Sequence, residues 1–124
     1  MADIILRIPA NQLRHFSDDK TTTDLAFWRF SKRPSNLNKG DHIFFTRPEG
    51  IVFAATVDRI MEGEALTDEI NVFHMFGDAG NFNACWNGHN TQTFDPPITD
   101  INYAGRSYRY LTAPEQKKLR ALLN

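Results

Sequence analysis

The chain has 124 residues, 41% of them hydrophobic, and a formal net charge of −1. This length and composition predict one soluble domain, residues 1–124, with a single hydrophobic core. The near-zero charge excludes recognition of nucleic acid through overall positive charge, so any such binding requires a local cationic patch.

The first quarter of the chain predicts a strand, a helical turn and a polar loop. Asp3–Ile8 alternates as a strand does, and Pro9 can open a helical turn that carries Leu13 and Phe16 inward. The segment 17–24 is wholly polar. It indicates a surface loop and a candidate lid beside the residues that follow it.

A β-hairpin is predicted next. The runs His42–Thr46 and Ile51–Val57 are rich in β-branched and aromatic residues, and the turn chemistry of Arg47–Gly50 separates them. We assign Phe44, Phe45 and Phe53 to the core. Because neighbouring residues of a strand belong to opposite faces, Phe44 or Phe45 must point outward unless both faces of the sheet are covered.

The second half begins with weaker signals. Met61–Ala65 indicates an acidic connection, and Leu66–Phe76 fits a short helix slightly better than a strand. After a turn at 78–81, residues 82–94 predict a strand interrupted near Asn87–Gly88 and ended by Asp95–Pro97.

The C-terminus predicts a helix from Ala113. Thr112 and Glu115 form a capping box with proline in the first turn. We expect an apolar helix face that covers the core and basic residues that remain in solvent. The expected apolar residues are Leu119, Leu122 and Leu123, and the expected solvent-exposed cations are Lys117, Lys118 and Arg120.

A candidate binding surface lies between these elements. A pocket for one nucleobase needs aromatic walls, polar groups for the base edge and cations for the flanking phosphates. We nominate Trp28 and Trp86 as walls, Ser31 and Asn87 for the base edge, and Arg29, Lys32 and Arg33 for the phosphates. A tryptophan in a small β-domain is more often part of the core, so that interpretation stays open for both.

Signals for catalysis and metal binding are sparse. The four histidines are scattered, and Cys85 with His89 supplies too few ligands for a zinc site. Cys85 cannot form an internal disulfide, no apolar run approaches the ~20 residues that span a bilayer, and no signal-peptide pattern is present. We expect a cytoplasmic protein with no cofactor, no metal and no membrane partner.

The pattern of residues 27–60 resembles the PUA-like superfamily and its EVE, YTH and ASCH branches. The resemblance rests on the aromatic-Trp-Arg segment, Lys39-Gly40-Asp41, and the two strands around a glycine turn, with Val57–Ile60 after them. Residues 94–98 and 108–112 before a closing helix are also similar to the end of such domains. The resemblance implies an α+β, mostly β pseudo-barrel with short helices and a C-terminal helix.

The ASCH branch includes amidohydrolases that act on modified cytidines through a lysine, a threonine and a glutamate. By analogy these would be Lys32, Thr46 and Glu49, although the Gly-x-Lys start of such members is absent.

The sequence therefore favours a module that recognises nucleic acid, RNA or DNA, and reads a modified or flipped base. One alternative is a small ASCH-like amidohydrolase. Another is a protein-interaction module, because six acidic residues and one basic residue lie between Asp58 and Asp78. In contrast, five basic residues and one acidic residue lie between Arg29 and Arg47.

Overall fold

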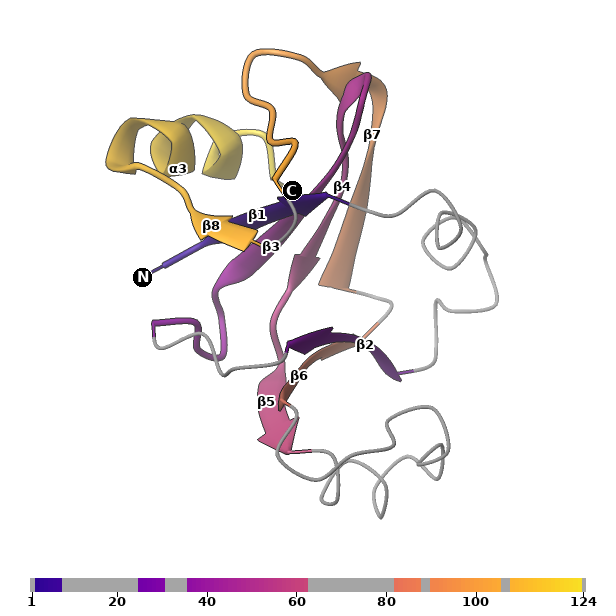
Figure 1. Ribbon diagram of the computed structural model, residues 1–124, viewed down its shortest axis with the longest axis vertical. Helices are drawn as coiled ribbons and strands as arrows, with labels where there is room; N and C mark the ends of the chain where they lie inside the picture. The colour runs from indigo at the N-terminus through magenta and orange to yellow at the C-terminus, as the bar shows by residue number, and fades with distance from the viewer. Residues whose placement is uncertain are drawn as a thin grey trace.

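The computed structural model describes residues 2–7, 25–30, 36–62, 82–87, 90–105 and 108–123, with the backbone alone at 25–30, 61–62 and 82–87. The elements are β1 (Ile4–Arg7), β2 (Leu25–Phe30), β3 (His42–Arg47), β4 (Gly50–Thr56), β5 (Arg59–Glu62), β6 (Phe82–Asn87), β7 (Thr91–Ile98), β8 (Tyr108–Tyr110) and α3 (Ala113–Arg120). The expected α+β, mostly β fold class is confirmed (Figure 1). Within these ranges no helix is long and apolar enough to cross a membrane.

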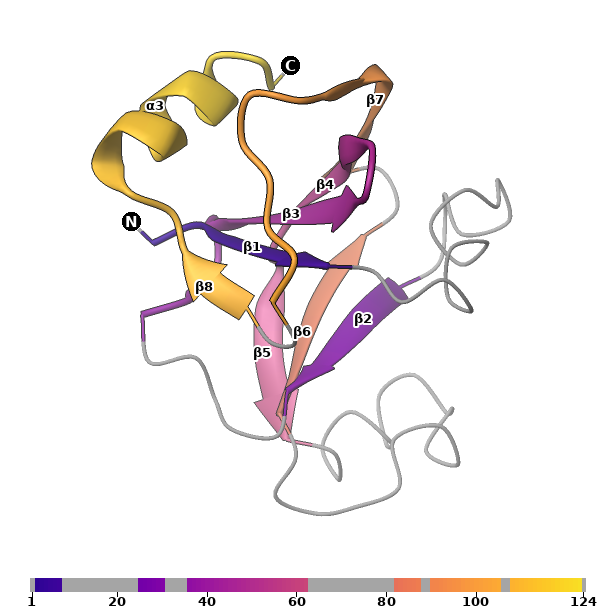
Figure 2. The ribbon, with the colours of Figure 1, turned by 45° about the horizontal axis from the view of Figure 1, so that its top comes forward.

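The strands form two sheets that continue into one another. The larger sheet has the order β7-β4-β3-β1-β8, and the smaller has the order β2-β6-β5. Only Val57 and Asp58 separate β4 from β5, and three residues separate β6 from β7, so the chain crosses directly between the sheets at both points (Figure 2). This arrangement is the expected pseudo-barrel.

The predicted hairpin is confirmed as β3 and β4, with Arg47 paired to Gly50 across the turn. Gly50 has a φ of 136°, which L side chains rarely adopt. A Cβ at this position would also meet the carbonyl oxygen of Ile98 on the neighbouring strand β7. Glycine is therefore required both by the turn and by the close approach of β7.

Both faces of the larger sheet are covered, which explains why Phe44 and Phe45 are each fully buried. One face carries the inner cluster: Ile4, Leu6, Leu37, Ile43, Phe45, Phe53, Ala55 and Val57. The other carries the helix-side cluster: Ile5, Phe44, Ile51, Ala54, Ile101, Leu111 and Leu119. The placement of all three hairpin phenylalanines in the core is confirmed, and Phe44, the ring on the second face, lies in the cluster that α3 covers.

Two strand predictions are wrong. Met61–Ala65 was expected to be a connection, but Arg59–Glu62 forms β5 and pairs with β6. The strand after position 90 was expected to end at Asp95–Pro97, but β7 continues to Ile98. β7 lies at the edge of its sheet, and its pairing with β4 is irregular between Thr93 and Ile98, so both prolines lie where the regular ladder is interrupted.

The predicted helix start is confirmed, with Thr112 as the N-cap of α3. The Thr112 hydroxyl accepts from the Glu115 backbone N–H, and the Glu115 carboxylate accepts from the Thr112 backbone N–H at 2.9 Å. Arg109 adds two hydrogen bonds to the same carboxylate at 2.7 and 2.9 Å. These bonds, Arg109 foremost, lower the pKa of Glu115 to about 2.

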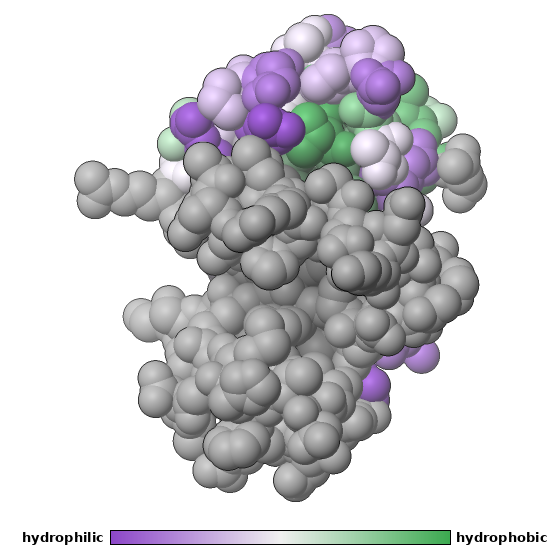
Figure 3. All heavy atoms as spheres, turned by 90° about the vertical axis from the view of Figure 1, so that its right-hand side faces the viewer, coloured by the Kyte–Doolittle hydropathy of each residue, from purple (hydrophilic) through white to green (hydrophobic). Residues whose placement is uncertain are grey.

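The apolar face of α3 is narrower than predicted. Leu119 is fully buried and Leu123 packs against the helix-side cluster, but Leu122 is 45% exposed. The helix ends at Arg120, so the helical spacing no longer applies to Leu122. The described surface seen from the side is largely hydrophilic, with a smaller hydrophobic area within it (Figure 3).

The prediction that Arg120 remains in solvent is wrong. Its guanidinium donates to both carboxylate oxygens of Asp3, each at 2.7 Å, and Asp3 is fully buried. The His42 backbone N–H donates to the same carboxylate at 2.8 Å. Burial alone would raise the pKa of Asp3, but the hydrogen bonds from His42 and Arg120 outweigh it and lower the pKa from 3.8 to about 2.

Four further expectations lie outside the described residues. They are the helical turn after Pro9, the polar loop 17–24, the short helix at 66–76 and the turn at 78–81.

Replacing the buried carboxylate should destabilise the protein. We expect Asp3→Asn to lower the free energy of unfolding by about 3 kcal/mol, the low end for a broken buried ion pair, because Arg120 keeps partial contact with solvent. Because the folded protein lowers the pKa of Asp3, ionised Asp3 stabilises the wild type fully above pH 3.8, and this stabilisation is lost as the pH falls through about 2. The difference in unfolding free energy between Asp3→Asn and the wild type should therefore shrink over that pH interval. Urea unfolding at several pH values measures both effects.

The matched control is Asp100→Asn. Asp100 pairs with Lys118, and both side chains are at least half exposed. An exposed pair contributes less than about 1 kcal/mol, so this variant should unfold almost as the wild type does. Equal losses in the two variants would contradict the anchoring role of Asp3.

Candidate nucleic-acid interface

The smaller sheet brings the two tryptophan positions together. β2 and β6 pair antiparallel, with Trp28 opposite Ala84 and Ala26 opposite Trp86. Trp28 and Trp86 therefore occupy diagonal positions on the same face of neighbouring strands. Such positions lie about 7–8 Å apart, within reach of aromatic side chains.

The face that holds these positions adjoins the inner cluster. Ala84 pairs with Trp28 on one side and with Ile60 of β5 on the other, so the three positions share one face. The Ile60 side chain is partly buried and packs against the inner cluster. The tryptophan face of the smaller sheet is thus the face that meets the interior of the pseudo-barrel.

Arg29 and Asn87 occupy the opposite face. Arg29 pairs with Asn83 and Asn87 with Leu25, one residue out of phase with the tryptophan positions. β2 is the edge strand of the smaller sheet, and Asn87 is the last residue of β6. A ligand that passes around this edge would meet both faces.

The remaining nominated residues, Ser31, Lys32 and Arg33, lie outside the described residues. The fold therefore brings Trp28 and Trp86 to one face and puts Arg29 and Asn87 on the other.

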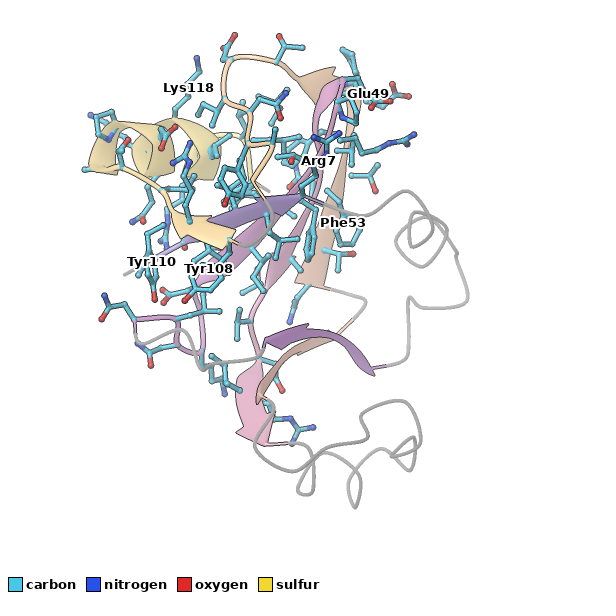
Figure 4. All side chains as sticks on the ribbon, viewed as in Figure 1. Arg7, Glu49, Phe53, Tyr108, Tyr110 and Lys118 are labelled. Carbon is cyan, nitrogen blue, oxygen red and sulfur yellow. The ribbon has the colours of Figure 1, made fainter. Side chains whose placement is uncertain are left out.

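A pair of tyrosines that the sequence analysis did not nominate borders the same interior. Tyr108 and Tyr110 lie on the edge strand β8, partly buried against the inner cluster (Figure 4). Their rings meet edge to face with centroids 5.7 Å apart. Burial and the neighbouring Tyr110 raise the pKa of Tyr108. The Tyr-Arg-Tyr alternation was the available signal, since it puts both rings on one face of a strand.

Two of the three residues nominated by analogy with amidohydrolases, Thr46 and Glu49, have structural partners. Thr46 is fully buried, and its hydroxyl lies 3.3 Å from the Leu6 carbonyl and 2.9 Å from the Tyr103 carbonyl, both acceptors. Glu49 sits in the hairpin turn, 3.5 Å from the Arg47 guanidinium. The Thr46 hydroxyl thus joins β1 and the segment before β8 to β3.

The two continuous sheets, the covering helix and the strand order form an ASCH-type fold, as the resemblance implied. Solved structures with this fold include ASCH from Zymomonas mobilis, with a TM-score of 0.59 and 12% identity over 98% of this chain and 96% of that chain. A tyrosine-to-phenylalanine variant of that protein matches with a TM-score of 0.59 over 99% of its length, and a serine-to-alanine variant with 0.55 over 96%. At 12% identity the likeness establishes the fold. No family model matches the chain, and neither does any curated protein.

We expect Thr46→Val to lower the free energy of unfolding by about 1–2 kcal/mol, because it removes the single hydroxyl proton that the Leu6 and Tyr103 carbonyls share, while the side-chain volume is kept. Thr46→Ser retains the hydroxyl and serves as the control. Thermal melts compare the two variants, and a Thr46→Val protein as stable as Thr46→Ser would contradict the structural role of the hydroxyl.

Proposed function

We propose that this protein is a nucleic-acid recognition module that holds one base, in a single-stranded or flipped context, between Trp28 and Trp86. Lys32 and Arg33 would contact the flanking phosphates, and Ser31 the polar edge of the base. Arg29 and Asn87, whose positions are on the opposite face of the smaller sheet, would contact a neighbouring nucleotide that passes around its edge. An aromatic cage of this kind suits a modified base, because an added methyl or acyl group increases the apolar surface that the rings cover.

One observation carries the proposal: the diagonal placement of Trp28 and Trp86 on the face that adjoins the interior of the barrel. Stacking on aromatic rings tolerates any base and contributes about 1–3 kcal/mol per base. The sheet would set the spacing of two rings at these positions, and a base that entered between them would require little rearrangement of the backbone.

The charge distribution supports a small footprint. With a net charge of −1, the protein lacks the long-range field that draws extended duplexes to basic domains. The basic residues from Arg29 to Arg47 are few and local. Recognition of one base with its neighbouring phosphates fits this supply of cations, whereas binding along a long groove does not.

Removing one wall should weaken binding without unfolding the protein. We expect Trp28→Leu to reduce affinity for short single-stranded oligonucleotides by about 1–3 kcal/mol, because leucine fills apolar volume but offers no ring for stacking. The chain has only two tryptophans, so intrinsic fluorescence reports on the proposed walls directly. Titration with oligoribonucleotides and oligodeoxyribonucleotides, with and without a methylated base, measures the change.

Trp28→Phe is the matched control, since it preserves an aromatic face. Binding retained in Trp28→Phe and reduced in Trp28→Leu supports stacking. If both variants bind as the wild type does, or if Trp28→Leu fails to melt cooperatively, Trp28 belongs to the core and the proposed pocket is wrong.

The proposed phosphate contacts predict a shallow salt dependence. We expect a slope of log affinity against log salt of roughly −0.7 per contact, for about one to four contacts. Reversing Lys32 and Arg33 together to glutamate should remove most of this slope. The double change Lys117→Glu with Lys118→Glu alters the net charge equally but on α3, and its slope should match the wild type. Identical slopes in the two double variants would contradict the assigned contacts.

A further inference from the structure

The loop Asn36–Asp41, which precedes β3, is held in one conformation by hydrogen bonds from distant parts of the chain. The Asn36 backbone N–H donates to the Tyr110 hydroxyl at 3.0 Å, across 74 residues of sequence. The Asn38 side-chain amide donates to the Asn36 carbonyl at 3.3 Å. Between them Leu37 is fully buried in the inner cluster. The start of the loop is thus fixed to β8 and to the core.

The end of the loop is fixed in the same way. Gly40 donates to the Val57 carbonyl at 2.9 Å, and Val57 donates back to the Asp41 carbonyl at 2.8 Å. The Asp41 carboxylate, itself buried, accepts from the Asn38 backbone N–H at 3.0 Å. These hydrogen bonds join residues of the loop to one another and to Val57, which follows β4. The acid of the Lys39-Gly40-Asp41 motif therefore serves the loop and faces inward.

The outer surface of this loop is open, polar and cationic. Asn36, Asn38, Lys39 and Gly40 are exposed, and a Cβ built on Gly40 would meet no atom within 4 Å. Among the described residues, Lys39 forms no ion pair. The nearest acid in sequence, Asp41, accepts a hydrogen bond from the Asn38 backbone N–H and lies 3.9 Å from the Arg120 guanidinium. The partly buried rings of Tyr108 and Tyr110 adjoin the loop through the Asn36 contact.

The loop and the tryptophan face adjoin the same interior. Leu37 of the loop is a member of the inner cluster, and Ile60, which shares a face with the Trp28 position, packs against that cluster. The loop and the tryptophan face are thus both fixed to one buried cluster.

We propose that the Asn36–Asp41 loop is a second contact for single-stranded nucleic acid, in which Lys39 binds a backbone phosphate and Tyr110 is a positioning residue that holds the loop. This inference rests on the proposed function. A loop that is already ordered loses little conformational entropy when it binds, so a single lysine on it contributes more than one on a free chain. Lysine suits the role because its ammonium group acts as a compact point charge for phosphate.

The test compares two exposed lysines that undergo the same change of charge. Lys39→Glu should weaken binding of an unstructured oligouridine about five- to tenfold and reduce the magnitude of the salt slope by about 0.7, the value for one lost contact to a single strand. Lys117→Glu lies on α3, over the opposite face of the larger sheet, and should leave both quantities near the wild-type values.

The positioning role is tested by Tyr110→Phe, which removes the acceptor for Asn36 and keeps the ring. Binding should weaken about threefold in the wild-type background and not at all in the Lys39→Glu background, because residues that act through one contact are not additive. Tyr103→Phe removes a phenol hydroxyl on the helix side of the sheet and controls for loss of a tyrosine oxygen. Thermal melts confirm that each variant is folded.

The outcomes separate the two proposals. If the wild type binds oligouridine but Lys39→Glu and Lys117→Glu weaken it equally, the loop contact is wrong and the proposed function stands. If Tyr110→Phe weakens binding equally in both backgrounds, its positioning role is wrong. If the wild type binds neither oligouridine nor an oligodeoxynucleotide, the proposed function and this inference both fail.

Discussion

The buried carboxylate of Asp3 is the interaction on which the arrangement of the described elements depends. It accepts hydrogen bonds from Arg120, 117 residues away, and from His42 at the start of β3. β1 pairs in parallel with β3 and antiparallel with β8, so it needs a partner on each side from distant sequence. An unpaired charge at this buried position would destabilise the fold. The contacts of Asp3 with Arg120 and His42 avoid this, and they form only when α3, β1 and β3 meet.

Coverage of both faces of the larger sheet creates a conflict between packing and binding. The inner cluster must be shielded from water, and the smaller sheet that shields it also carries the Trp28 and Trp86 positions. A ring that fills the interior is not available for a base. Along β8 the inner cluster is bordered by the partly buried Tyr108 and Tyr110. A ligand that entered the interior along β8 would therefore disrupt the least packing.

Local signals in the sequence were sufficient for elements that depend on neighbouring residues. The hairpin and the capping box of α3 were predicted because turn chemistry and the cap act within a few positions. Short β5 carries no such signal and exists because β6 pairs with it. Likewise, the basic pattern of the last helical turn predicted solvent for Arg120, since nothing near it in sequence reveals the carboxylate of Asp3. The candidate site has the same limit: Trp28 and Trp86 were recognised as residue types, but only the β2–β6 register puts their positions on the same face.

The ion pairs of the described residues limit how a nucleic acid could be bound. Arg109 and Arg120 hold carboxylates that fix α3, and Arg47, Arg59 and Lys118 each lie beside an acid. These cations stabilise the fold or neutralise neighbouring charge, so they add little to an attractive field for phosphate. Affinity would then have to come mainly from stacking and from a few ordered contacts, which act only at close range. Contacts of such short range would favour recognition of a single nucleotide over coating of a strand.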